Sequence, residues 1–194
     1  AGPDASAAEL AFEAWLIARE LASGFTTVDA NVFDQVQAKL RSVSTHSDGL
    51  YDVAEMHIGF RLPPGIDPFI LERRLRADLA ESSLLASGGV TIEVRASGHE
   101  FAHSGDPRSW LVGCMSTAIR DRGRRPRLLR KTGTSDMNVV ARVWDCPIIA
   151  YGPGDSSLDH TPVERLAIDE YLAAITTLRS ALAGILARVA SGPA

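Results

Sequence analysis

Apolar residues recur with two different spacings in the first half of the chain, and these spacings predict alternating helices and strands. A spacing of three to four residues predicts helices over residues 6–23 and 67–82, each with a helix-capping residue type at its start. Alternation of apolar and polar residues predicts strands over residues 53–62 and 90–96 and, less regularly, over residues 32–43. The order is helix, strand, strand, helix, strand, so one further strand in front of the sequence would complete a ferredoxin-like βαββαβ unit.

The alternation is clearest in residues 53–62. Apolar side chains occupy every second position from 54 to 60, and most of the positions between them are polar. Since successive side chains of a strand point to opposite faces, the two sets should lie on opposite faces of the sheet. The apolar set is Ala54, Met56, Ile58 and Phe60, and the polar set is Glu55, His57 and Arg61.

The second half of the chain shows a different order of elements. Helical spacing covers residues 110–122 and 168–189, and the longer helix should turn its leucine and isoleucine stripe inward. Between them, the short apolar run 146–151 is consistent with a fully buried strand. Helix, loop, buried strand, loop and helix are typical of a parallel α/β sheet. The stripe consists of Leu172, Ile175, Leu178, Leu182 and Ile185.

Composition excludes some classes of protein. Hydrophobic residues make up 45% and charged residues 23% of the chain, which is ordinary for a globular protein. No uninterrupted apolar run approaches the roughly 20 residues that span a bilayer, so we expect no membrane association. Two cysteines are too few for a disulfide framework, and we expect both to be buried. With no segment typical of a secretory signal, these features favour a cytoplasmic protein.

Basic residues crowd into one short stretch of a chain whose net charge is −4. Only Asp121 opposes them there. The stretch suggests a docking surface for a negatively charged partner, and a solvated helix end is the simpler alternative. Nucleic acid is a poor candidate, because the first half has no aromatic strand motif for stacking bases. The residues are Arg120, Arg122, Arg124, Arg125, Arg127, Arg130 and Lys131.

The loop that follows this stretch is more polar than a connection requires. Gly133 permits close approach of a ligand to the backbone. Thr134, Ser135 and Asn138 supply hydrogen-bond donors and acceptors. The simpler explanation is that Ser135 or Asp136 caps the next helix.

A second polar loop, residues 151–164, follows the apolar run. It should therefore lie at the carboxyl end of a strand, where open α/β sheets place their sites. His160 carries an imidazole suited to Zn²⁺, and Asp159 or Glu164 could orient its other ring nitrogen. The alternative is that this lone histidine is structural or exposed.

Taken together, these segments resemble the C-terminal half of M20 metallopeptidases and deacylases. The likeness is strongest to the branch that acts on lysine or ornithine held by an acidic amino-group carrier protein, or on acetyl-lysine. It rests on Phe60-Arg61-Leu62-Pro63-Pro64-Gly65, Gly133-Thr134-Ser135-Asp136, Tyr151-Gly152-Pro153 and Asp159-His160-Thr161-Pro162-Val163-Glu164.

The resemblance implies a fold and a set of roles. Family members have an α/β catalytic domain interrupted by a ferredoxin-like lid that forms a homodimer, and they use two zinc ions or sometimes cobalt. Residues 1–101 would be the lid domain without its first strand, and residues 102–194 the C-terminal part of the catalytic domain. His160 would ligate one metal, and Arg61 would grip a substrate carboxylate. Gly133, Thr134 and Ser135 would contact substrate, with Asn138 in a supporting role.

Other family residues have no counterpart in this sequence. The early His-x-Asp motif, the bridging aspartate and the Glu-Glu pair that includes the general base are absent, so we assign no catalytic residue and expect the 194 residues alone to be inactive. The complete enzyme would release lysine or ornithine from the carrier protein, or deacetylate a small acyl-amino acid, in amino-acid biosynthesis. The alternative is a non-catalytic dimerisation module derived from such an enzyme.

Overall fold

A computed structural model describes residues 5–26, 31–86, 89–131 and 133–191. The chain divides into two compact units. The first contains residues 1–103 and 130–140, and the second contains residues 104–129 and 141–194.

The first unit is built from two helices and a hairpin. α1 (Ala7–Gly24) begins with a capping box, in which the Ser6 hydroxyl accepts from the Glu9 N–H and the Glu9 carboxylate accepts from the Ser6 N–H. α2 (Pro68–Glu81) begins at a proline, and the Asp67 carboxylate accepts hydrogen bonds from the first free N–H groups. Both predicted helices are confirmed.

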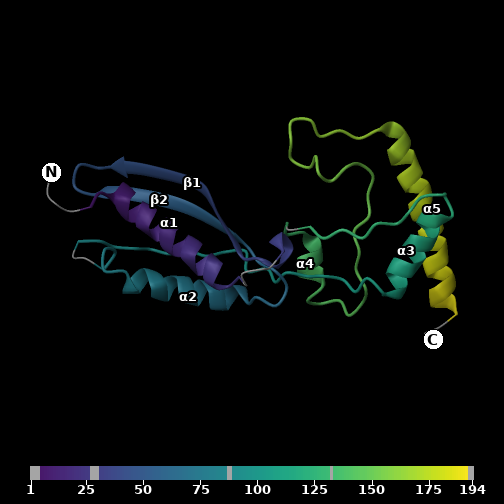
Figure 1. Cartoon of the computed structure of the whole chain (residues 1–194), viewed down its shortest axis with the longest axis horizontal. Coiled ribbons are helices and arrows are strands. Elements are labelled where there is room, and N and C mark those ends of the chain that lie inside the picture. Colours follow the sequence, from purple (N-terminus) through teal and green to yellow (C-terminus); the bar gives the residue numbers. More distant parts are fainter. Residues whose placement is uncertain (1–4, 27–30, 87–88, 132, 192–194) are drawn as a thin grey trace. The chain divides into compact units, whose positions relative to one another are not determined.

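The hairpin joins β1 (Gln37–Ser47) and β2 (Asp52–Arg61) in antiparallel register, with Gln37 opposite Arg61. The Asp48 carboxylate accepts hydrogen bonds from two N–H groups of the connecting turn. Along β2 the predicted apolar set is partly buried and the polar set is exposed, as the alternation requires. β1 starts later than predicted, because Val32–Asp34 forms the 3-10 turn η1. Figure 1 shows α1 and α2 beside this hairpin.

The core of the first unit is small. Leu21, Ala22, Val36 and Leu71 form its buried centre. Phe60 and other partly buried apolar residues pack around them. The hairpin and both helices therefore depend on one shared cluster.

Two predicted strands are wrong. Neither Val90–Ala96 nor Cys146–Tyr151 is a strand, and the sheet in the described part of the chain has only β1 and β2. The sequence of each segment suits a strand, but a strand forms only when a second backbone lies beside it to accept and donate hydrogen bonds. Cys146 is exposed as well, and Cys114 is partly buried, contrary to the expectation that both are buried.

The second unit is built around two helices, α3 (Trp110–Arg120) and α5 (Ile168–Ala190), which pack together. The buried residues of α5 are small: Ala174, Thr177 and Ala181. The predicted inward stripe is wrong for Leu172, Ile175, Leu178 and Leu182, which are exposed, while Ile185 is partly buried. Small residues allow close approach to α3, and the leucines of the stripe are exposed.

By length and composition alone, α5 could also cross a membrane. Within its 18-residue apolar segment, 17% is buried. Core helices of soluble proteins can be equally long and apolar, so this property is weak evidence that α5 spans a membrane. A leucine stripe that packs against further protein explains the composition equally well.

Candidate functional site

One end of the first unit brings together several of the residues singled out from the sequence. Arg61 is exposed at the end of β2, opposite Gln37. Three residues before Gln37, the Asp34 carboxylate accepts a hydrogen bond of 3.3 Å from Arg130 Nη1. This ion pair ties the start of the polar loop to the end of the hairpin at which Arg61 lies.

The polar loop is braced from inside by Asn138, on the short helix α4 (Asp136–Val140). Its Oδ1 accepts from the Ser135 N–H at 2.9 Å, and its Nδ2 donates to the Phe101 carbonyl at 2.9 Å. The Phe101 ring lies 6.3 Å from that of Phe69, on the first turn of α2. The loop is thus anchored at both ends to the rest of the first unit. The side chain of Asn138 therefore orients the loop.

Gly133, Thr134 and Ser135 are exposed at the tip of this loop. Gly133 has no left-handed backbone that would require glycine, and a Cβ added there would meet nothing within 4 Å. The fold itself therefore gives no reason for glycine at this position.

His160 lies in the second unit and has an unusual backbone. Its φ of 63° is the one positive value among the described non-glycine residues. Its N–H donates to the Glu164 carboxylate at 2.8 Å, so Glu164 braces the loop through the backbone. The imidazole is exposed. Left-handed backbone costs a non-glycine residue about 1–2 kcal/mol, and such strain is commonly retained where a side chain has a task.

The described residues do not form a complete metal site. No group of three or more His, Cys, Asp or Glu side chains comes together among them. The donor chemistry of His160 suits one position in the coordination shell of zinc, and the remaining ligands would have to come from elsewhere.

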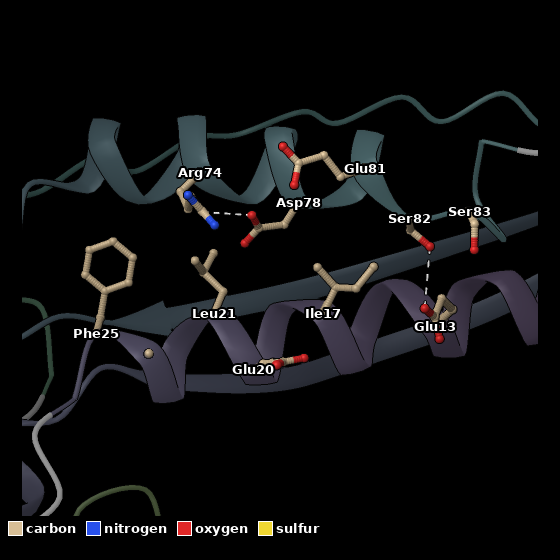
Figure 2. Close-up of a pocket in the computed structure, with 11 residues that line it drawn as sticks. Glu13, Ile17, Glu20, Leu21, Phe25, Arg74, Asp78, Glu81, Ser82 and Ser83 are labelled. Atoms are coloured by element: carbon tan, nitrogen blue, oxygen red, sulfur yellow. Dashed lines mark hydrogen bonds and ion pairs between the residues drawn. The ribbon is translucent and has the colours of Figure 1, made fainter.

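One polar cavity lies outside the predicted site. A cavity of about 740 Å³ between α1 and α2 is lined by acidic residues such as Glu13, Glu20 and Glu81 (Figure 2). Within it, Asp78 pairs with Arg74 at 2.7 Å. None of the residues singled out from the sequence lines it.

The contacts that position the loop were missed by the sequence reasoning. Arg130 and Asp34 are 96 positions apart, and Asn138 and Phe101 are 37 apart. Neither pair has a local sequence signal. The left-handed backbone of His160 likewise has no signal, although histidine adopts this region more readily than most residues.

The chain is similar to known proteins over most of its length. The chain is 41% identical over 185 residues to the [LysW]-lysine hydrolase of Deinococcus radiodurans, which covers 94% of this chain and 49% of the relative. It is 34% identical over 172 residues to a putative [LysW]-lysine/[LysW]-ornithine hydrolase of Thermococcus kodakarensis, covering 89% of this chain and 42% of that protein. The chain is a homologue of the [LysW]-lysine hydrolases. No family model matches it.

The structure supports the same relationship at the level of fold. An M20 family metallo-carboxypeptidase from Sulfolobus solfataricus superposes with a TM-score of 0.61 at 21% identity, covering 88% of this chain and 44% of that one. The mixed α/β class is thereby confirmed, and the fold is similar to that of an M20 family enzyme. The chain spans about half the length of the curated relatives it matches. The boundary at residue 101 and the ferredoxin-like lid stay predictions, as do the roles of the individual site residues.

Proposed function

We propose that this chain is part of an M20-type, metal-dependent amide hydrolase that releases lysine or ornithine from a carrier protein in amino-acid biosynthesis. The observation that carries the proposal is the identity of 41% to a [LysW]-lysine hydrolase across 94% of the chain. In this proposal the enzyme is a cytoplasmic homodimer that uses zinc or cobalt.

Each unit of the chain would make a different contribution. In the first unit, Arg61 presents a planar guanidinium to a substrate carboxylate. The loop at Gly133–Ser135 lies at the same end of that unit and offers backbone and hydroxyl groups to the rest of the substrate. In the second unit, His160 supplies one metal ligand. A bound metal lowers the pKa of a water and polarises the scissile carbonyl.

A chimera tests the proposal directly. The aligned region of the Deinococcus radiodurans hydrolase would be replaced by this chain, and release of lysine from [LysW]-lysine would be measured. We expect turnover by the chimera and none by the isolated 194 residues with added zinc or cobalt. A soluble, metal-loaded chimera that leaves [LysW]-lysine intact would favour the non-catalytic dimerisation module instead.

The loop glycine gives a sharper test of substrate contact. Gly133→Ala in the chimera should raise KM about tenfold or more, because the added methyl group occupies space that substrate approaches. The structure leaves room for that methyl group, so thermal stability should not change. Gly113→Ala, which also adds a methyl group into open space but lies on α3, is the matched control. An unchanged KM for Gly133→Ala would remove this residue from the substrate site.

The basic stretch at residues 120–131 predicts that opposite charge speeds the association of an acidic carrier with the enzyme. Arg124 and Arg125 are exposed after the end of α3. Reversing both charges should slow association of an acidic carrier about tenfold at low salt and flatten its salt dependence, because steering by opposite charge raises association rates. Stopped-flow association with the carrier measures this. Arg73→Glu with Arg179→Glu changes the net charge equally at exposed positions elsewhere, and an equal effect of that pair would refute local steering.

A further inference from the structure

The outward face of the hairpin has a glycine that is covered by an arginine side chain. Alternation puts Gly59 on the face of β2 that carries Arg61, and Phe60 on the opposite face, which packs into the core. A Cβ added to Gly59 would lie 2.7 Å from Arg41 Nε and 3.6 Å from Arg41 Cδ. The side chain of Arg41 therefore lies across the backbone of β2 at this position, and a larger residue than glycine would displace it.

A break in the strand register brings Arg41 to this glycine. β1 pairs with β2 regularly as far as Leu40, and the pairing resumes at Ser42. Arg41 is therefore an extra residue that has no counterpart on β2. A β-bulge of this kind bends its strand and re-aims a side chain. Glycine within a strand is unfavourable and often marks a place where another group approaches the backbone closely. The bulge and the glycine together position one guanidinium on the outward face.

Two more cationic side chains lie at this part of the face. Lys39 is directly opposite Gly59 in the register, and Arg61 is two residues further along β2. Two residues of a strand span roughly 7 Å, so all three cations can reach one small ligand. All three are exposed. The acid closest to Gly59 along the strand, Glu55, is four residues before it, and the intervening roughly 13 Å exceeds the Debye length of about 8 Å at physiological salt.

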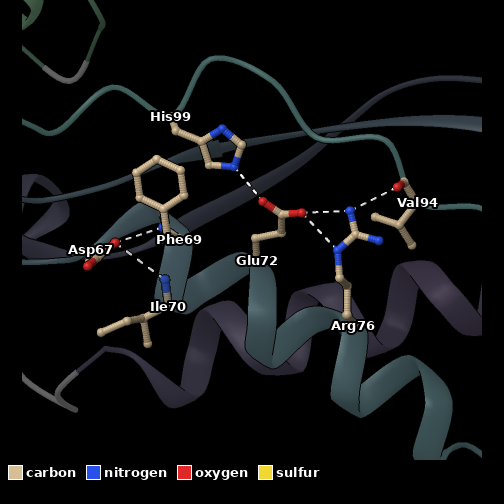
Figure 3. Close-up of polar contacts among 7 residues, drawn as sticks. All are labelled: Asp67, Phe69, Ile70, Glu72, Arg76, Val94 and His99. Carbon is tan, nitrogen blue, oxygen red and sulfur yellow. Dashed lines mark hydrogen bonds and ion pairs between the residues drawn. The ribbon is translucent and has the colours of Figure 1, made fainter.

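The charges of Lys39 and Arg41 are not balanced within the part of the chain that the structure describes. None of the ion pairs among these residues involves either of them. By contrast, Arg76 Nη2 lies 2.6 Å from the Glu72 carboxylate (Figure 3). In a chain whose net charge is −4, this unbalanced group of cations favours binding of an anion. The arginines of the first unit that pair with a carboxylate are Arg74 with Asp78, Arg76 with Glu72, Arg95 with Glu93, and Arg130 with Asp34.

We propose that Lys39 and Arg41 form a subsite for a second carboxylate beside Arg61, so that the preferred substrate carries two carboxylates. Guanidinium and ammonium groups donate charge-assisted hydrogen bonds to carboxylates. The inference rests on the proposed function, in which Arg61 holds the carboxylate of the amino acid that is released. The second carboxylate then belongs to the acyl group on the other side of the scissile amide. The substrate class is an amino acid in amide linkage to an acidic acyl group, and acetyl substrates are poor ones.

Binding of small carboxylates to the 194-residue chain tests the subsite without catalysis. Adipate has two carboxylates, and hexanoate has one on a carbon chain of equal length. Both would be titrated at low ionic strength while the backbone amide signals of β1 and β2 are followed by NMR. We expect adipate to bind about tenfold more tightly, since its second carboxylate adds charge-assisted contacts to those of the first. Equal affinity of the two compounds overturns the proposal.

Two substitutions separate a positioned guanidinium from charge alone. Arg41→Gln removes the charge, whereas Gly59→Ala keeps it and places a methyl group where the guanidinium lies. Each should reduce the preference for adipate to less than about threefold. Arg73→Gln removes an equal charge from an exposed position on α2 and should keep the full preference. The proposal is overturned if Gly59→Ala also keeps it, or if Arg73→Gln loses as much as Arg41→Gln.

Hydrolysis by the chimera with the Deinococcus radiodurans enzyme relates the subsite to the reaction. Lysine acylated on its α-amino group with either glutaryl or pentanoyl would be compared, because these acyl groups have equal numbers of carbons and differ by one carboxylate. We expect kcat/KM to be about tenfold higher for the glutaryl substrate, and Arg41→Gln to bring the ratio close to one. Equal kcat/KM for the two substrates overturns the subsite and leaves the hydrolase function standing. Failure to hydrolyse [LysW]-lysine as well contradicts the proposed function, and the adipate titration then decides the subsite.

Discussion

Replacing His160 with alanine in the chimera should abolish release of lysine from [LysW]-lysine. The expected loss in kcat/KM is larger than the roughly 10–100-fold that follows when only an outer partner of a metal ligand is removed. The reason is that the imidazole of His160 is, in our proposal, one of the metal ligands. Bound zinc, measured by elemental analysis of the purified chimera, should fall in parallel with activity.

The left-handed backbone of His160 requires a second variant at this position. Alanine keeps the strain of a φ of 63°, whereas glycine relieves it. If the imidazole is needed, His160→Gly and His160→Ala should be equally inactive, although the glycine variant should be at least as stable. A glycine variant that retains activity would show that position 160 matters for its loop conformation only. Glu164→Ala removes the acceptor of the His160 N–H and so isolates the contribution of that contact.

The largest expected effect on stability is at Leu71. This residue is 4% exposed and belongs to the buried centre shared by both helices and the hairpin. Leu71→Ala should lower the free energy of unfolding of the first unit by about 2–5 kcal/mol, through lost burial and a residual cavity. Because the core is small, much of the unit's stability would be lost.

A neighbouring residue supplies the matched control for Leu71. Ile70 is on the same helix and is 46% exposed, so Ile70→Ala should change the free energy of unfolding by less than about 0.5 kcal/mol. Urea unfolding followed by amide exchange in β1 and β2 measures the first unit separately from the second. Equal destabilisation by the two substitutions would show that the hairpin does not depend on the Leu71 cluster.

Most of the secondary structure could be predicted from the sequence because its causes are local. Ser6 and Glu9 form a capping box within one turn, and Asp67 with Pro68 starts α2. The alternation from Ala54 to Phe60 fixes which face of β2 is buried. In each case the residues that interact are neighbours along the chain.

The roles of the candidate site residues stay predictions, and the contacts that hold these residues in place could not be predicted from the sequence. Motif resemblance singled out Arg61, the loop at Gly133 and His160. That Arg61 and the loop lie at the same end of one unit depends on the Arg130–Asp34 and Asn138–Phe101 contacts, which join distant positions. The two units are described separately, with the Gly133 loop in the first and His160 in the second.

Sequence by itself determined where helices begin and which residues alternate, and it pointed to the M20-type relationship. Tertiary structure alone decided that residues 90–96 and 146–151 are unpaired, and that α5 buries Ala174 and Ala181 while its leucines are exposed. The physical reason is that capping and periodicity are properties of a short segment. Strand pairing and helix packing also require a second surface, and the sequence of one segment does not specify which surface lies beside it.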